Sequence, residues 1–287
     1  MKKLKTTIFL TLKLIGIEVL TKKQKRVLNK YKPKSNSEID SFIFFTTHKA
    51  ASNFTNQILK EVEQISEFEL YDYGALIGSI SEKLNITDQF EEYLNENHKT
   101  LFKLNGEIYG PQRLPLNFTG INDYKKIFFL RDPRDVLVSA YYSFGYSHVE
   151  PDSTSMIDSF LKKRATIQNQ TIDEYVLEEM ERWIKPAYMN YKKLRLESTN
   201  DVLYLKYNDY IEDTEGIVNK ILTFFGLENR DLAKRLAMSA NPITRLEEKD
   251  QHKRSGKNNQ WKTHLKQSTQ DELNIKLKDI LEFWDFI

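Results

Sequence analysis

The chain has 287 residues, of which 40% are hydrophobic and 12% aromatic. This length and composition suit one large α/β domain or two small ones with a real hydrophobic core, and they exclude a disordered chain. The formal net charge of +2 is too small to indicate a nucleic-acid-binding protein, so any anion binding must come from local clusters. The absence of cysteine excludes a disulfide scaffold, a thiolate zinc site and a cysteine nucleophile, and the presence of only five histidines argues against a histidine-rich metal site.

Residues 1–37 are expected to form an N-terminal helix and a linker ahead of a domain at 38–287. Thr6–Leu20 is rich in apolar residues and follows a basic start, which faintly resembles a signal peptide or a membrane anchor. Lys13 and Glu18 interrupt this run, which is short for a membrane span and lacks a small-residue cleavage site. We therefore expect a helix docked on the domain of a cytoplasmic protein, and a helix lying on a membrane surface is the less favoured alternative.

Short apolar runs alternate with helical patterns along the rest of the chain. The runs that predict strands are Ser41–Thr47, Thr100–Leu104, Ile127–Leu130 and Asp201–Tyr207. Helical periodicity covers Phe54–Ile65, most of Glu67–Asn97, Ile172–Leu196 with an expected kink at Pro186, Thr214–Phe225, Arg230–Ser239 and Gln270–Phe283. This alternation predicts an α/β fold, with a central parallel sheet flanked by helices in a single domain.

The stretch Lys125–Phe144, KKIFFLRDPRDVLVSAYYSF, is the most informative in the chain. A buried strand ends directly before Arg131 and Asp132, and Pro133 suits the first position of a helix. A charged strand end that leads into a helix N-terminus is a place where an anion can bind. The alternative is that these charged residues only form surface ion pairs around a turn.

A second candidate anion site is the loop after the first strand, which reads THKAASNF over Thr47–Phe54. Small residues let backbone N–H groups approach an anion, and the following helix adds its positive end. Lys49 would supply a mobile charge, and Ser52 and Asn53 would supply further donors. An ordinary turn capped by Ser52 is the alternative. The nucleotide-triphosphate pattern GxxxxGK[ST] is absent, which argues against an ordinary P-loop kinase or ATPase.

Four segments, taken together, resemble the sulfotransferases that use 3′-phosphoadenosine 5′-phosphosulfate (PAPS). Lys49–Phe54 is similar to the family's phosphosulfate-binding loop, usually written PKSGTTW. Arg131–Phe144 resembles the signature that binds the 3′-phosphate, and Asp201–Asp209 resembles the strand that borders the adenine. Arg254–Lys262, RSGKNNQWK, resembles the late RKGxxGDWK loop. The matches occur in the family's order, and they imply a P-loop-like nucleotide-binding fold.

The resemblance also implies a role for each matching residue. Lys49 would contact the phosphosulfate and stabilise the leaving oxygen, and Lys103, which matches the lysine of the family's KTH stretch, would reach the sulfonate. The implied cofactor-binding residues are Lys49, Ala50, Ala51, Ser52, Asn53 and Phe54 in the first loop, Tyr207 at the adenine, and Arg131, Ser139, Arg254, Ser255 and Gly256 at the 3′-phosphate.

Three departures from the family pattern matter. Ala51 replaces a loop glycine and crowds the backbone slightly, and Ser255 replaces a lysine of the 3′-phosphate clamp. Asn105 stands where cytosolic members have the histidine of KTH, and an amide cannot take up a proton. The usual catalytic base is therefore missing from its expected position.

Two residues are equally ranked candidates for a replacement base. Glu107 lies two residues further along the same loop, where burial could raise the pKa of its carboxyl. His148 follows the Arg131 helix, and histidine titrates near neutrality without tuning. His48 is expected to point away from Lys49 in a tight loop. An acceptor amine that needs no strong base is the remaining alternative.

The sequence thus predicts an enzyme that transfers a sulfonate from PAPS to a hydroxyl or amine of a small molecule, with PAPS as co-substrate and no metal. A glycan or lipid acceptor is the alternative within this class. A non-catalytic nucleotide-binding regulator, or a P-loop nucleotide kinase, is the alternative outside it. No nucleic-acid partner is expected.

Overall fold

The computed structural model describes residues 38–72, 98–113, 115–150, 154–240 and 257–287. Several predictions therefore fall outside the described residues. These are the N-terminal helix and linker at 1–37, most of the acidic helical segment Glu67–Asn97, and the late-loop residues Arg254, Ser255 and Gly256.

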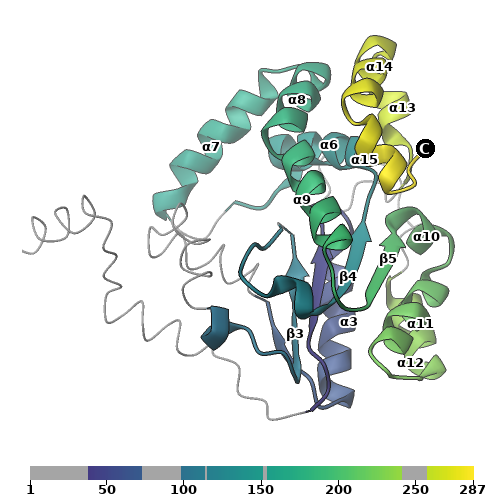
Figure 1. Ribbon diagram of the computed structural model, residues 1–287. Helices are drawn as coiled ribbons and strands as arrows, with labels where there is room; N and C mark the ends of the chain where they lie inside the picture. Colours follow the sequence, from purple (N-terminus) through teal and green to yellow (C-terminus); the bar gives the residue numbers. More distant parts are fainter. Residues whose placement is uncertain (1–37, 73–97, 114, 151–153, 241–256) are drawn as a thin grey trace, which may run out of the picture.

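The described residues contain one sheet, with strands in the order β2-β3-β1-β4-β5 and every neighbouring pair parallel (Figure 1). Parallel strands need crossover connections, and helices accordingly cover both faces of the sheet. This confirms the predicted α/β class with a central parallel sheet. The strands are β1 (Phe42–Thr46), β2 (Glu69–Tyr71), β3 (Glu107–Gln112), β4 (Lys125–Leu130) and β5 (Val202–Lys206).

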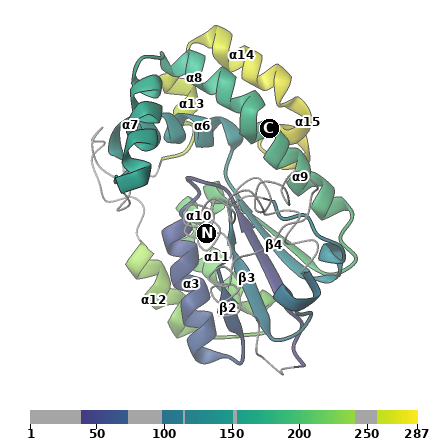
Figure 2. The same ribbon diagram turned by 90° about the vertical axis from the view of Figure 1, so that its left-hand side faces the viewer.

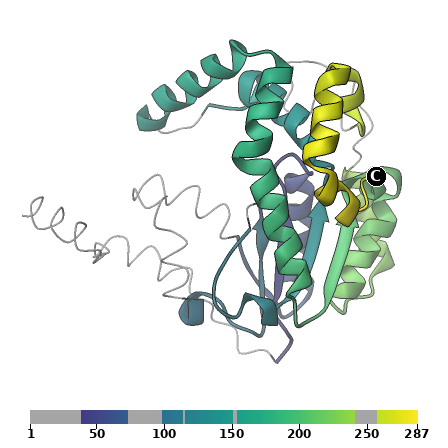
Figure 3. The same cartoon turned by 45° about the horizontal axis from the view of Figure 1, so that its top comes forward.

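Helices of the described residues surround this sheet (Figures 1 and 3). Two short π-helical turns, Ser143–Ser147 and Met180–Ile184, lie at the ends of helices. The α-helices are α3 (Ser52–Ile65), α6 (Pro133–Tyr142), α7 (Thr154–Gln168), α8 (Ile172–Glu179), α9 (Lys185–Leu196), α10 (Tyr207–Glu212), α11 (Thr214–Phe224), α12 (Arg230–Ala240), α13 (Gln260–His264), α14 (Gln267–Lys276) and α15 (Lys278–Phe283).

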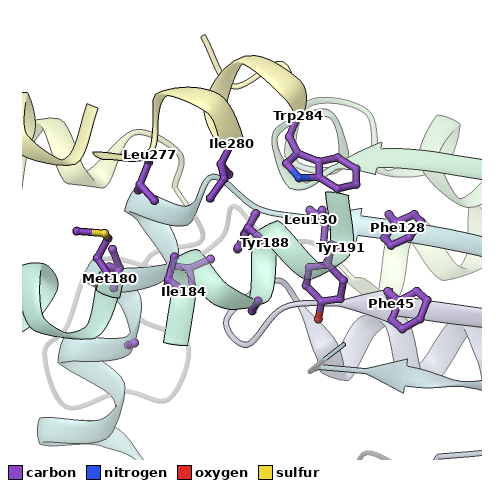
Figure 4. Close-up of a cluster of buried hydrophobic side chains, with 14 of the residues drawn as sticks. Phe45, Phe128, Leu130, Met180, Ile184, Tyr188, Tyr191, Leu277, Ile280 and Trp284 are labelled. Carbon is purple, nitrogen blue, oxygen red and sulfur yellow. The ribbon is translucent and has the colours of Figure 1, made fainter. Parts of the chain in front are cut away.

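Alternate residues of β1 contribute to two separate hydrophobic cores, one on each face of the sheet. Phe42 and Phe44 pack with buried side chains of α3, α10, α11 and α12. Figure 2 shows the arrangement of these helices beside the sheet. Ile43 and Phe45 belong to the opposite core, with α6, α8, α9 and the C-terminal helices α13–α15. In that core Phe45 stacks on Phe128 of β4 with ring centroids 5.1 Å apart (Figure 4). Burial on both faces explains why β1 and β4 are continuous apolar runs in the sequence.

The predicted strand at Thr100–Leu104 is wrong. Residues up to Leu101 are helical, and the strand in this part of the chain is β3, which begins at Glu107. Within this run Leu101 and Phe102 are buried, with Phe102 stacked on Phe118 at 4.1 Å, whereas Leu104 is exposed. In β3, a Cβ on Gly110 would lie 2.8 Å from the Cβ of Phe44, so the close approach of β3 to β1 requires glycine there.

The predicted long helix Ile172–Leu196 is interrupted, as expected, near Pro186. Helix α8 passes through the π-helical turn Met180–Ile184 into α9, and Pro186 lies in the first turn of α9. A proline ring leaves no room for the carbonyl four residues earlier, and a π-helical turn removes that clash. The predicted helix Gln270–Phe283 is likewise two helices, α14 and α15, which meet at Leu277.

Candidate active site

The carboxyl ends of three adjacent strands form one edge of the sheet, which we call the carboxyl edge. There β1 leads into the loop Thr47–Ala51, β4 ends before Arg131, and β3 ends before Arg113. The strand pairings place β1 between the other two. In open α/β sheets ligands bind at this edge, so both predicted anion-binding segments meet where a ligand is expected.

The loop between β1 and α3 is shaped by two left-handed residues, Lys49 (φ 66°) and Ala51 (φ 52°). Such backbone is uncommon for residues other than glycine and stores strain at functional sites. Helix α3 begins at Ser52, and the residue before it, Ala51, has no side chain that caps the helix. The alternative of a turn capped by Ser52 is therefore not what forms, and the N-terminal end of α3 keeps the positive character that attracts anions.

Lys49 connects this loop to two other segments. Its Nζ donates a hydrogen bond of 2.9 Å to Oγ of Ser143, at the end of α6. Its backbone carbonyl accepts a hydrogen bond of 2.9 Å from Arg131. The lysine predicted to meet the phosphosulfate thus lies beside the arginine predicted to meet the 3′-phosphate.

Arg131 is 3% exposed and lies at the centre of this edge. Its guanidinium group donates to the carbonyls of Lys49 and of Lys257, the latter over 3.0 Å, and lies 4.5 Å above the ring of Tyr207. Its Nε is buried and has no hydrogen-bond partner among the described residues. Since an unpaired buried donor costs about 1–3 kcal/mol, this atom favours an additional acceptor.

Two tyrosines of α9 hold the strand ends in place (Figure 4). The hydroxyl of Tyr188 donates to the carbonyl of Arg131, and that of Tyr191 donates to the carbonyl of Thr46 over 2.8 Å. Burial raises the pKa of both phenols well above the usual value, so both stay neutral donors. These hydrogen bonds fix the ends of β4 and β1 relative to each other.

The other charged residues of the β4–α6 segment are buried, which excludes the alternative of surface ion pairs. Asp132 caps α6 and pairs with Arg134 at 2.6 Å, and Arg134 lies 3.9 Å from the ring of Trp261. Asp135 accepts backbone hydrogen bonds from Asn259 and Trp261. Burial raises the pKa of the Asp135 carboxyl, and the nearby Arg131 opposes this. The segment therefore fixes the end of the late loop against Arg131.

The remaining predicted cofactor residues lie around this centre. Ser139 is half-buried on α6, one helical turn after Asp135, and Tyr207 begins α10 at the end of β5. Ala50 is fully buried, whereas Asn53 in the first turn of α3 is exposed. Phe54 is 7% exposed, because its ring packs against Tyr210 at 4.6 Å.

The structure does not bring Lys103 and Glu107 to this edge. Both lie at the amino edge of the sheet, because β3 begins at Glu107 and runs parallel to β1. Glu107 is fully buried, and Lys103 lines a surface pocket of about 670 Å³ together with Asn105. A strand of this length spans about 17–20 Å, which separates both residues from Lys49. Their predicted place at a strand end depended on the wrong strand.

His148 lies in the loop after α6 and is exposed. Its ring is 5.7 Å from that of Phe144 and 6.1 Å from that of Phe160, and its carbonyl accepts a hydrogen bond from Arg164. It is close enough to His48 to affect the charge state of that residue. His148 therefore lies near His48, and its role as a base stays a prediction.

Sequence reasoning set His48 aside and missed Arg113. The His48 ring is half-buried, edge-on to Trp183 at 6.0 Å. Burial, and then the charges of Arg113, Lys49, His148 and Lys163, lower the pKa of His48 to about 4. These four residues therefore lie near the ring. Arg113 directly follows β3, and a correct placement of that strand would have drawn attention to it.

Cationic side chains and an uncapped helix N-terminus at the carboxyl edge of a parallel sheet are typical of α/β proteins that bind phosphorylated nucleotides. A model of the sulfotransferase domain matches residues 38–279 of this chain. The chain therefore belongs to the sulfotransferase family and is an enzyme of that class, as the sequence predicts. No curated protein matches the sequence significantly.

Solved structures with a similar fold include several sulfotransferases. A complex of retinol dehydratase with androsterone and the inactive cofactor PAP has a TM-score of 0.55 and 16% sequence identity. The match covers 90% of this chain and 85% of retinol dehydratase. Mouse SULT7A1 complexed with PAP has a TM-score of 0.49 and 14% sequence identity, and the match covers 90% of this chain and 88% of that protein. A sulfotransferase from Alicyclobacillus acidocaldarius has a TM-score of 0.42 and 12% sequence identity, and the match covers 87% of this chain and 95% of that protein. At a TM-score of 0.55 and 16% identity, the match to retinol dehydratase shows a shared fold alone.

The described part of the chain holds no group of three or more His, Cys, Asp or Glu side chains placed to share a metal ion. Among the helices between residues 38 and 287 that the structure describes, none is long and apolar enough to cross a membrane.

Proposed function

We propose that this sulfotransferase uses PAPS as donor and a hydroxyl or amine of a small molecule as acceptor, and that it releases 3′,5′-adenosine bisphosphate (PAP). One observation carries the proposal. Arg131, with an unpaired buried Nε, lies beside Lys49 and the uncapped start of α3 at adjacent strand ends. A donor with a phosphate at each end of a nucleoside needs two anion sites on adjacent strands, and the chain offers both.

In this proposal the 3′-phosphate binds Arg131 and Ser139, with Arg254, Ser255 and Gly256 joining from the late loop. The carbonyl of Lys257, which directly follows Gly256 in the sequence, accepts a hydrogen bond from Arg131, and this supports the proposal. A guanidinium fork suits a phosphate dianion, and its hydrogen bonds to the loop carbonyls orient it.

The phosphosulfate binds Lys49 and the backbone of Ala50, Ala51, Ser52 and Asn53. The adenine lies near Tyr207, whose ring is already beneath Arg131. Phe54 contributes less than its family counterpart, because its ring packs in the core against Tyr210. These residues bind the donor and align its sulfonate, which is the main requirement of transfer chemistry of this kind.

In the reaction the sulfur–oxygen bond to the 5′-phosphate breaks as the acceptor oxygen or nitrogen bonds to sulfur. Lys49 stabilises the negative charge on the leaving phosphate oxygen. The acceptor proton passes to a base at the carboxyl edge, for which His148 and His48 are the candidates. Glu107 is left out because it lies at the amino edge, and Lys103 is left out for the same reason.

The neighbouring fold also informs the acceptor. Retinol dehydratase was crystallised with androsterone, a small molecule. The aromatic side chains Trp183, Phe144 and Phe160 near the two histidines offer apolar contacts to an acceptor of this chain. These contacts support a small-molecule acceptor over a glycan.

Calorimetry tests the donor assignment. PAP should bind more tightly than 5′-AMP, and Arg131→Ala should reduce this difference by about 1.5–3 kcal/mol. Equal affinities of the unmodified protein for the two nucleotides would refute the 3′-phosphate site. Incubation with radiolabelled PAPS and a metabolite extract tests transfer, and tight PAP binding without any labelled product would instead indicate a nucleotide-binding regulator.

A further inference from the structure

Three cationic residues follow three adjacent strands in the order of the sheet. Arg131 follows β4, Lys49 lies in the loop after β1, and Arg113 follows β3. If the proposed function holds, the 3′-phosphate occupies the β4 end and the phosphosulfate the β1 end. The β3 end then lies on the far side of the sulfonate from the nucleotide, which is where an acceptor must approach.

The β3 end carries an excess of positive charge from several elements. Arg113 from β3, Lys163 from α7 and His148 from the loop after α6 all act electrostatically on His48. Neither Arg113 nor Lys163 forms an ion pair with a carboxylate of the described residues, whereas the neighbouring Arg164 pairs with Glu150 at 3.8 Å. Nothing in the described part of the protein therefore balances the charge of Arg113.

Buried polar atoms at the same strand end also lack partners. Nε of Arg113 and Nε2 of Gln112 are buried and donate to no hydrogen-bond partner among the described residues. Gln112 is 1% exposed and pairs in register with Phe45 of β1. Both atoms are donors, so a group that binds at Arg113 must offer a hydrogen-bond acceptor. An unmet buried donor costs about 1–3 kcal/mol, which such a group would recover.

We infer that the acceptor is an anion, a small molecule that carries a carboxylate, phosphate or sulfate group bound by Arg113 in addition to the hydroxyl or amine that receives the sulfonate. A guanidinium group binds such oxyanions through two parallel hydrogen bonds. The rings of Trp183 and Phe144 contact the remainder of the acceptor. Lys163 lies 5.3 Å from the ring of Phe144 and adds to the attraction.

The experiment separates metabolites by charge before the enzyme meets them. A cell extract is divided on an anion-exchange resin at pH 7 into an anionic pool and a neutral or cationic pool, and each receives the enzyme and radiolabelled PAPS. Label in products from the anionic pool is expected, at tenfold or more over the other pool. Label mainly in the neutral or cationic pool would overturn the inference and leave the proposed function intact. No label in either pool would overturn both.

A variant then tests the role of Arg113 on the labelled acceptor. Arg113→Gln should lower kcat/KM for the acceptor at least tenfold while the KM for PAPS stays within about twofold. Arg235→Gln, which removes an exposed arginine of α12, is the matched control and should change neither value. If Arg113→Gln instead raises the KM for PAPS and affects neutral acceptors equally, Arg113 binds the donor sulfonate and the inference is wrong. Arg113→Lys keeps the positive charge and serves as a second variant if Arg113→Gln folds poorly. It should keep part of the activity that Arg113→Gln loses.

Discussion

His48 should make the stability of this protein depend on pH in a defined window. The pKa of His48 is lowered to about 4 in the folded protein, against about 6.5 in an unfolded chain. Between these values the unfolded state binds more protons, so the free energy of unfolding falls as the pH drops from about 6.5 to about 4. The full shift corresponds to about 3.4 kcal/mol at 1.36 kcal/mol per pKa unit. Because the ring is partly exposed, we expect a loss of about 2 kcal/mol by pH 4.5.

His48→Gln isolates this contribution, because glutamine does not titrate. Urea unfolding at pH 7 and pH 4.5 should show the unmodified protein losing about 2 kcal/mol more stability than the variant. Above pH 7.5 the difference between the two proteins should stay constant, which serves as the internal control. An equal loss in both proteins would show that His48 takes up a proton in the folded state, and it would refute the argument from burial and the four surrounding cations.

Three further outcomes are expected. Lys49→Ala should lower kcat by tenfold or more with a smaller effect on PAP affinity, since charge develops on the leaving oxygen mainly in the transition state; a loss of affinity alone would make Lys49 a binding residue. In pH–rate profiles, an acidic limb near pH 4 that His48→Gln removes would identify His48 as the base, whereas a limb lost only in His148→Gln would identify that residue. Asp135→Asn should lower the free energy of unfolding in urea by about 1–3 kcal/mol. The N–H groups of Asn259 and Trp261 donate to different oxygens of Asp135, and an amide has only one oxygen to accept them. Unchanged stability would contradict this.

The parts of the fold that the sequence predicts well are those in which local pattern and burial agree. Strands β1 and β4 are buried on both faces, so they contain the short continuous apolar runs Phe42–Phe45 and Ile127–Leu130. The two predicted anion-binding segments directly follow these strands, and their charged residues are close in sequence. Motif and strand therefore point to the same edge of the sheet, and the structure places them there together.

The parts that the sequence does not predict depend on packing between distant segments. Strand β3 contains Gly110 and Pro111, which are typical of a loop, and glycine is needed there only because Phe44 of β1 lies against it. The apolar run at Thr100–Leu104 offered a better pattern, so the strand was placed one segment too early. That shift moved Lys103 and Glu107 into the predicted site and left Arg113 unnoticed. Which face a loop histidine such as His48 presents also depends on neighbours from α7 and from the π-helical turn Met180–Ile184.

The contacts of Arg131 determine how its substitution must be read. One guanidinium group joins segments that are far apart in the sequence, through the carbonyls of Lys49 and Lys257. Arg131→Ala therefore removes a contact to the 3′-phosphate and also loosens both loops that surround the nucleotide. A fall in PAP affinity alone would not separate these effects. The loosened loops weaken PAP and 5′-AMP alike, whereas the lost phosphate contact weakens only PAP, so the ratio of the two affinities measures the contact itself.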